Sequence, residues 1–208
     1  MSTHPVALEI EYPDRPLNRL TTAFRPFVAI PILILLGTVS GESIDWTSGD
    51  TRKTVVSAGG LLFLGPLLMI LFRGRYPGWW FDWNLNLVRF GTRVAAFIAL
   101  LDDRYPSTED EQAVHLSMLH PDVAGGDISR GLPLVKWLLA VPHYIVLFFL
   151  WIGVVVAVVL AWFAILFTGR YPRGLFDFVV GVGRWHLRVI GYAFVLATDV
   201  YPPFRLTP

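Results

Sequence analysis

Hydrophobic residues along this chain gather in long apolar runs of the kind that membrane helices form. In the first half, two such runs cover residues 24–40 and 54–72. In the second half, residues 132–167 are almost continuously apolar, with Lys136 and His143 as their titratable side chains. The pattern predicts a transmembrane helical hairpin in each half.

The second apolar run is too long for one straight helix across a membrane. Its helix would be about 54 Å long, against about 30 Å for the hydrocarbon core of a bilayer. We therefore expect a tight turn near Trp151-Ile152-Gly153, which divides the run into two short spans. The alternative is one span over 144–167, preceded by a helix that lies in the membrane plane.

Two further segments, 82–101 and 177–198, predict amphipathic helices with a narrow polar stripe. We expect these helices to lie in the membrane interface with their arginines toward lipid phosphates, because two arginines in the middle of a span would be costly. The alternative is a third span whose polar stripe is buried against protein. The stripe consists of Asp82, Asn86, Arg89 and Arg93 in the first half and Asp177, Gly181, Arg184 and Arg188 in the second.

Polar and apolar residues alternate in two short segments, at 6–12 and 113–119. Period-two alternation is typical of a half-buried β-strand, so two short strands are predicted, and they could pair with each other. Irregular surface segments are the alternative.

The chain repeats part of its own sequence. FRGRYPGWWFD at 72–82 returns as FTGRYPRGLFD at 167–177, which is 95 positions later. FVAIP at 27–31 resembles LLAVP at 138–142 with a spacing of 111, so the first copy holds 16 extra residues, which fit the polar stretch near 41–54. We interpret the chain as a tandem repeat.

These patterns predict an all-α membrane protein of two tandem repeats, each a transmembrane helical hairpin followed by an amphipathic interfacial helix, with short β-strands added. The first repeat covers 1–106, and the second covers 132–208. Residues 107–131 form an acidic, Gly-rich linker that includes the start of the second repeat.

Each repeat contains an RYP turn, in which a glycine ends the apolar run and a proline follows. Gly74 and Gly169 occupy the position where a helix ends, and glycine is favoured there because it accepts the left-handed conformation. Pro77 and Pro172 prevent the helix from continuing. We therefore predict a helix end at each turn.

Composition supports a membrane location. Hydrophobic residues make up 54% of the 208 residues and charged residues only 16%, against about 25% in ordinary soluble domains. The chain has no cysteine, which excludes disulfides and thiolate metal sites, and its net charge of +1 favours no nucleic-acid partner.

The distribution of basic residues predicts an orientation. Of the 17 basic residues, 15 are arginines, and most of them precede the first hairpin or follow one of the two hairpins. By the positive-inside rule, both termini, both RYP turns and both amphipathic helices are cytoplasmic, and the insert near 41–54 lies outside.

The repeated aspartates and arginines are the candidate functional residues. We expect them to contact anionic lipid headgroups or a partner, or to form structural ion pairs, with the aspartates capping helix starts. No catalytic, cofactor or metal site is expected, because the chain carries neither a phosphate-binding glycine loop nor a paired-histidine zinc signature. The candidates are Arg75, Asp82, Arg89, Arg93, Arg170, Arg173, Asp177, Arg184 and Arg188.

His143 stands near the start of the second apolar run, directly after a proline. A titratable group inside a membrane is often functional, so a proton relay is one interpretation, and an interfacial histidine is the other. The first copy has Ile32 at this position, which favours the second interpretation.

The second half resembles an uncharacterised family of bacterial, actinobacterial-type integral membrane domains, which is catalogued as a domain of unknown function and is often duplicated in one chain. The family's marks are P-H-Y, TGRYPRGLFDF and D-x-YPPF, which stand here at 142–144, 168–178 and 199–204. The first half is degenerate, with Pro31-Ile32-Leu33 for P-H-Y. The resemblance implies a small multi-pass protein of the bacterial cytoplasmic (inner) membrane and no particular activity.

Three functions compete at this stage. The first is an accessory or scaffolding subunit, not an enzyme, that contacts anionic lipid or a membrane-protein partner through its cytoplasmic arginines and aromatic residues. The alternative is a small transporter or channel, because internal repeats are common in transporters. A lipid-modifying enzyme is the third, and substitution of Asp177 by asparagine would abolish its turnover.

Overall fold

Two short strands from the two halves of the chain pair with each other in the computed structural model, which describes residues 4–40, 64–110 and 112–208. β1 (Val6–Ile10) and β2 (Val114–Met118) are antiparallel, with Leu8 opposite Leu116. The predicted strands are confirmed: Val6 and Leu8 of β1 and every second side chain of β2 are buried, and Ile10 is partly buried. The sheet has these two strands among the described residues.

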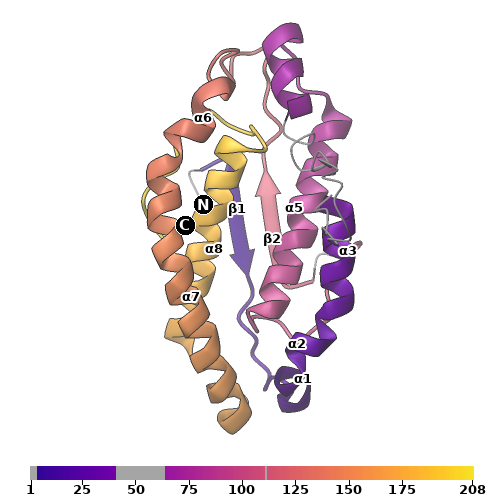
Figure 1. The fold of residues 1–208 in the computed structure, drawn as a ribbon, viewed down its shortest axis with the longest axis vertical. Helices are drawn as coiled ribbons and strands as arrows, with labels where there is room; N and C mark the ends of the chain where they lie inside the picture. Colours follow the sequence, from indigo (N-terminus) through magenta and orange to yellow (C-terminus); the bar gives the residue numbers. More distant parts are fainter. Residues whose placement is uncertain (1–3, 41–63, 111) are drawn as a thin grey trace, which may run out of the picture.

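One long amphipathic helix packs against each strand. α5 (Gly78–Ile98) contacts β2, and α8 (Arg173–Ala193) contacts β1. Both helices begin directly after the proline of an RYP turn, because proline cannot continue the preceding helix but accepts the extended conformation of a cap. Figure 1 shows that α5 and α8 run in opposite directions.

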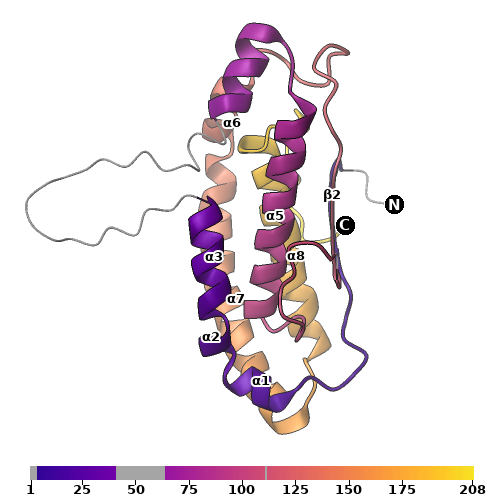
Figure 2. The same cartoon turned by 90° about the vertical axis from the view of Figure 1, so that its right-hand side faces the viewer.

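Apolar helices form an outer layer on the side away from the sheet. Figure 2 shows three layers, with α3 and α7 outermost, α5 and α8 in the middle, and the strands on the far side. The long helix of the outer layer is α7 (Val141–Thr168). The short elements are α1 (Arg19–Ala23), α2 (Arg25–Val28), α3 (Ile30–Ser40), the π-helical turn η1 (Met69–Arg73) and α6 (Pro133–Leu139), which precedes α7.

The predicted hairpin in the second half is wrong. α7 continues without a break through Gly153, where a tight turn was expected. It does so because a seam of side chains faces α8 along the whole helix, including Leu147, Val154 and Ala161. The alternative prediction, one span over 144–167 preceded by a helix in the membrane plane, agrees with α7 and α6 in its helical course, and its membrane placement stays a prediction.

The fold is mostly helical and contains one candidate membrane helix. Within the described residues, α7 alone is long and apolar enough to cross a membrane, and the other apolar helices, Arg25–Thr38 and Leu64–Arg73, are shorter. The predicted multi-pass topology is therefore not supported. The insert near 41–54, which was predicted to lie outside the cell, falls outside the described residues.

Candidate functional site

The outer surface of α7 is a continuous apolar face. Its buried seam packs on α8, and the side chains around that seam are exposed, with Phe148 at 64%, Val155 at 62% and Phe167 at 77%. α6 and α3 extend the face with Trp137, Leu138 and Ile34, which are half exposed. An apolar patch of this extent indicates contact with a membrane or another protein.

The opposite side of the molecule is polar. Glu9 in β1 and Glu11 just after it are exposed, and Ser117 on β2 is exposed beside them. The His115 Nε2 atom lies 3.2 Å from the Glu11 Oε1 atom across the strands. The two-stranded sheet therefore turns hydrophobic side chains toward α5 and α8 and polar side chains toward water.

The two RYP turns have the predicted backbone. Gly74 and Gly169 end their helices in the left-handed conformation, with φ of 59° and 75°. Arg75 and Arg170 follow these glycines and are exposed. Because α5 and α8 are antiparallel, the two turns lie at opposite ends of the molecule (Figure 1).

Asp82 and Asp177 are exposed and lie inside their helices. The predicted helix-capping role is wrong, because Pro77 and Pro172 occupy the cap positions and the aspartates follow a turn later. Neither aspartate forms an ion pair with another described residue. Arg173 is exposed, and its guanidinium lies 3.7 Å from the ring centre of Tyr12.

The arginines of the polar stripe face the sheet. The Arg89 Nε atom donates a hydrogen bond to the carbonyl oxygen of Leu116 at 3.0 Å, and the Arg184 Nε atom donates to that of Leu8 at 3.1 Å. These two carbonyls belong to the paired residues at the centre of the sheet. The stripe therefore holds each strand onto its helix, and the predicted lipid contact of these two side chains stays a prediction.

The next arginines of the stripe are buried and bind carbonyl oxygens of loops. Arg93 donates to Ser107 at 3.0 Å, and Arg188 donates to Arg205 at 3.3 Å and to Thr207 at 2.9 Å. Burial lowers the pKa of Arg188 from its ordinary value, because a charged guanidinium loses its hydration there. Arg93 and Arg188 thus anchor the segments that follow their helices.

Arg25 and Lys136 are two buried cations at corresponding positions of the two halves, and the sequence analysis did not predict this pair. Arg25 donates to the carbonyls of Phe97 and Asp102 at 3.2 and 2.7 Å, and Lys136 donates to that of Thr198 at 2.6 Å. Each cation also lies over an aromatic ring, that of Phe97 for Arg25 and that of Tyr192 for Lys136. The spacing of 111, already visible between FVAIP and LLAVP, relates Arg25 to Lys136 and could have identified the pair.

Lys136 differs from Arg25 in its ionic partner. The Lys136 Nζ atom lies 2.8 Å from the Asp199 Oδ1 atom, and the side chain of Lys136 is fully buried. Burial lowers the pKa of Lys136, and the hydrogen bond to Asp199 opposes that shift. This ion pair connects α6 to the segment that follows α8.

His143 is a packing residue in an aromatic cluster. Its Nδ1 atom accepts a hydrogen bond from the Trp185 indole at 3.1 Å, and its ring stacks on Phe204 at 4.0 Å. Tyr201 packs against the same imidazole. The cluster therefore joins the P-H-Y segment, α8 and the YPPF segment, while the Nε2 atom of the fully buried His143 has no hydrogen-bond partner among the described residues.

Comparison with known proteins finds one family match, in the second half of the chain. Residues 133–205 match a domain of unknown function (DUF4389). The match begins at α6 and ends just after the aromatic cluster, so it covers the part of the chain that contains α7 and α8. No match was found among curated proteins or among solved structures.

Proposed function

We propose that this protein binds the surface of a membrane, with its outer helical layer inserted into one leaflet and its sheet in water. In this position it acts as an accessory or scaffolding subunit for a membrane-protein partner. The opposition of two faces carries the proposal: α7 exposes large apolar side chains on one side, and Glu9, Glu11 and Ser117 are exposed on the other. Such two-sidedness is typical of proteins that lie in the membrane interface.

The position of the sheet favours a flat orientation over an upright one. The strands run beside the helices along the same long axis (Figures 1 and 2). If α7 crossed the bilayer upright, the sheet would lie at membrane depth with open edges and exposed carboxylates, and unsatisfied backbone groups in lipid cost several kcal/mol each. We therefore propose that α7 lies in the plane of the leaflet.

The proposed orientation agrees with a twofold relation between two copies. Contacts recur at constant spacing: Arg89 matches Arg184, and Gly74 matches Gly169. An axis through the Leu8–Leu116 pair, perpendicular to the sheet, would relate the copies. If that axis is the membrane normal, both RYP turns reach the same leaflet, as expected for the cytoplasmic face of a bacterial membrane with both termini on that side.

Vesicle flotation tests the proposal. Replacing Val156, which is 54% exposed on α7, by aspartate should reduce binding to phosphatidylcholine vesicles roughly a hundredfold, because a charge in hydrocarbon costs about 2.5–3.5 kcal/mol. Ser117→Asp, the same charge on the sheet, should leave binding unchanged. Equal effects of the two variants, or no binding by the wild type, would contradict the proposal.

The exposed arginines of the RYP turns predict a preference for anionic lipid. The double variant Arg75→Gln and Arg170→Gln should bind phosphatidylglycerol vesicles about 30-fold more weakly, at about 1 kcal/mol per arginine near the surface. Binding to phosphatidylcholine alone should not change. A loss on both lipids would mean that these arginines stabilise the fold rather than contact headgroups.

The antiparallel course of α5 and α8 favours a small transporter as the second candidate. If the long axis stood along the membrane normal, the copies would form an inverted repeat, which is common in transporters. Single cysteines at Asp82, Asp177 and Ser117 can be introduced, because the chain has no native cysteine. In sealed vesicles, an impermeant maleimide should reach all three from one side, whereas a transporter would expose Asp82 and Asp177 to opposite sides.

A further inference from the structure

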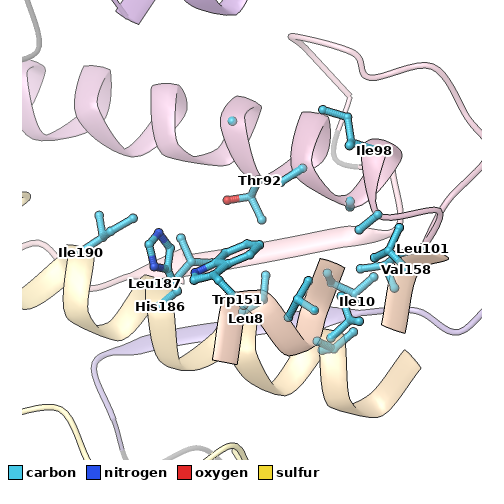
Figure 3. A pocket seen from close by; sticks show the side chains of 18 of the residues that line it. Leu8, Ile10, Thr92, Ile98, Leu101, Trp151, Val158, His186, Leu187 and Ile190 are labelled. Carbon is cyan, nitrogen blue, oxygen red and sulfur yellow. The ribbon is translucent and has the colours of Figure 1, made fainter. Parts of the chain in front are cut away.

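A large apolar cavity lies between α5, α7 and α8, with β1 at its floor (Figure 3). Its volume is about 650 Å³, within the range of about 300–1,000 Å³ that small-molecule sites occupy. Valine, leucine, isoleucine, alanine and glycine make up most of the wall, and its polar side chains are Thr92, Trp151 and His186.

The cavity opens on the apolar face that we assign to the membrane. Ile98, Val155 and Val159 line it and are also 42%, 62% and 49% exposed. An adjoining pocket of about 420 Å³ shares Ile98, Val158 and Val159 and continues past Trp162. A molecule that enters between α5 and α7 would therefore come from the hydrocarbon of the leaflet.

His186 supplies a hydrogen-bonding group at one end of the cavity. Figure 3 shows His186 and Ile190 at one end and Ile98 and Leu101 at the other. The imidazole packs edge-on against Trp151 at 5.5 Å, and its Nδ1 atom is buried without a hydrogen-bond partner among the described residues. Burial lowers the pKa of His186, so the neutral ring keeps one donor and one acceptor.

The other polar side chain on the α5 wall is already engaged. The Thr92 hydroxyl donates to the carbonyl oxygen of Val88 at 2.7 Å. A peptide segment in the cavity would bring several N–H and C=O groups that such a wall cannot satisfy, at a cost of roughly 1–3 kcal/mol each. A hydrocarbon chain brings none of these groups.

We infer that this cavity binds a single-chain lipid, a long-chain fatty acid taken from the leaflet, with its carboxyl group at His186 and its tail toward Ile98. The inference rests on the proposed membrane-surface function, because the mouth must face hydrocarbon. His186 at one end and Ile98 at the other suit one chain with a single polar end (Figure 3). The apolar wall keeps the carboxylic acid neutral, so that its carbonyl oxygen accepts a hydrogen bond from the imidazole.

The test uses the full chain in detergent micelles and a palmitic acid that carries a mid-chain diazirine. Photolabelling should be saturable at one probe per chain, should map to α5, α7 and α8, and should be displaced by unlabelled palmitate. Labelling that does not saturate and spreads over the outer faces of α6 and α7 would overturn the inference. So would a dimer in the native mass spectrum whose cavity excludes the probe, because a second copy would then be the occupant.

Filling the cavity should abolish the labelling. Among the described residues, a Cβ atom at Gly91, which lines the cavity, would meet only a Leu36 side-chain atom at 4.0 Å, so Gly91→Leu should fold and lower probe affinity roughly tenfold or more. Ala95→Phe fills the same space and guards against misfolding of the first variant. Gly37→Leu on α3 is the matched control, because no atom of the described residues lies within 4 Å of its Cβ position. Unchanged labelling in both filled variants would refute the site.

His186→Phe tests the polar end. Phenylalanine keeps an aromatic ring against Trp151 but removes the donor, so palmitate should bind about tenfold more weakly, whereas a diazirine alkane without oxygen should bind equally well. Equal loss for both probes would assign His186 a packing role only and overturn its place in the inference. Micelle binding does not depend on vesicle flotation, so failure of the membrane-surface proposal and failure of this site give different results.

Discussion

Among the described residues, the second half of the chain contains one unbroken apolar helix, and the first half contains two apolar helical pieces. α7 runs from Val141 to Thr168, and the corresponding stretch of the first half is α3 together with the helical residues 64–73. The starts of α3 and α7 are 111 residues apart, and the glycines that follow the two stretches are 95 apart. The difference equals the 16 extra residues of the predicted repeat, and these positions fall between the described residues 40 and 64.

The same comparison extends to the packing beneath the helices. His143 and Trp185 pack together in the second half, and Ile32 and Phe90 pack together at the corresponding place in the first. Lys136 has an aspartate partner in the second half, whereas Arg25 binds carbonyl oxygens in the first. A shared framework therefore carries different polar contacts, and this difference predicts unequal responses to matched substitutions.

The largest difference in stability loss between matched substitutions is expected at the buried cations. Lys136→Met removes one member of a buried ion pair and leaves the Asp199 carboxylate, which should lower the free energy of unfolding by about 3–5 kcal/mol. Arg25→Met leaves two carbonyl oxygens, so a loss of about 1–3 kcal/mol is expected. Thermal unfolding in detergent measures both. The exposed Arg15→Met, which breaks the ion pair with Asp103, should change stability by less than about 1 kcal/mol.

The order of these effects is the informative result. If Arg25→Met were as damaging as Lys136→Met, the two sites would be equivalent and Asp199 would add nothing. Replacing both Lys136 and Asp199 by apolar residues should recover part of the loss, because no unpaired charge then stays buried.

Alkaline pH should lower the free energy of unfolding through Tyr76. Burial raises the pKa of its phenol to about 12, because the phenolate would lose its hydration. The unfolded chain releases this proton near pH 10, so the contribution of Tyr76 is complete below pH 10 and is lost as the pH rises through 12. A two-unit shift corresponds to about 2–3 kcal/mol. Between pH 10 and 12, Tyr76→Phe should therefore lose less stability than the wild type.

Local patterns in the sequence predicted the parts of the fold that local physics decides. Alternation in 6–12 and 113–119 predicted the strands, and the glycine before each RYP motif predicted a left-handed helix end. The course of α7 could not be predicted in this way, because an apolar run is compatible with either a hairpin or a long helix. Packing against α8 decides between them.

The candidate site shows the same limit. Sequence spacing placed Arg89 and Arg184 each on the polar face of its own helix, but it could not show which residues that face contacts. The sheet that accepts their hydrogen bonds comes from residues far away in the chain: Arg184 and its acceptor Leu8 are 176 positions apart. Pairing across that distance depends on tertiary structure, so the sequence could not show that these two side chains bind strand carbonyls.

Substitution of the turn glycines should have the next largest effect on the free energy of unfolding. Gly74→Ala and Gly169→Ala each place a Cβ atom at positive φ, which costs roughly 1–2 kcal/mol. The added atom at Gly74 would also lie 3.0 Å from the Arg130 guanidinium, whereas its nearest neighbour at Gly169 is 3.7 Å away. The first variant should therefore be slightly less stable, and Arg130→Ala should remove the difference. Gly37→Ala, inside α3, should instead stabilise by about 0.5–1 kcal/mol.

The smallest expected effect separates the two tyrosines of the RYP turns. The Tyr76 hydroxyl donates to the carbonyl oxygen of Val195 at 2.9 Å and accepts from Asn84 at 3.3 Å, whereas the Tyr171 hydroxyl is buried without a partner among the described residues. At neutral pH, Tyr76→Phe should cost about 1 kcal/mol, because it leaves the Val195 carbonyl unsatisfied.

Tyr171→Phe removes a buried hydroxyl that makes no hydrogen bond within the part of the chain that the structure describes, so the stability of this variant should match or slightly exceed that of the wild type. Denaturant unfolding of both variants gives the comparison, with Tyr105→Phe, an exposed tyrosine, as the reference for loss of a hydroxyl. An equal cost for Tyr76→Phe and Tyr171→Phe would mean that Tyr171 also binds a polar group. The two turns would then be alike in hydrogen bonding as well as in backbone conformation.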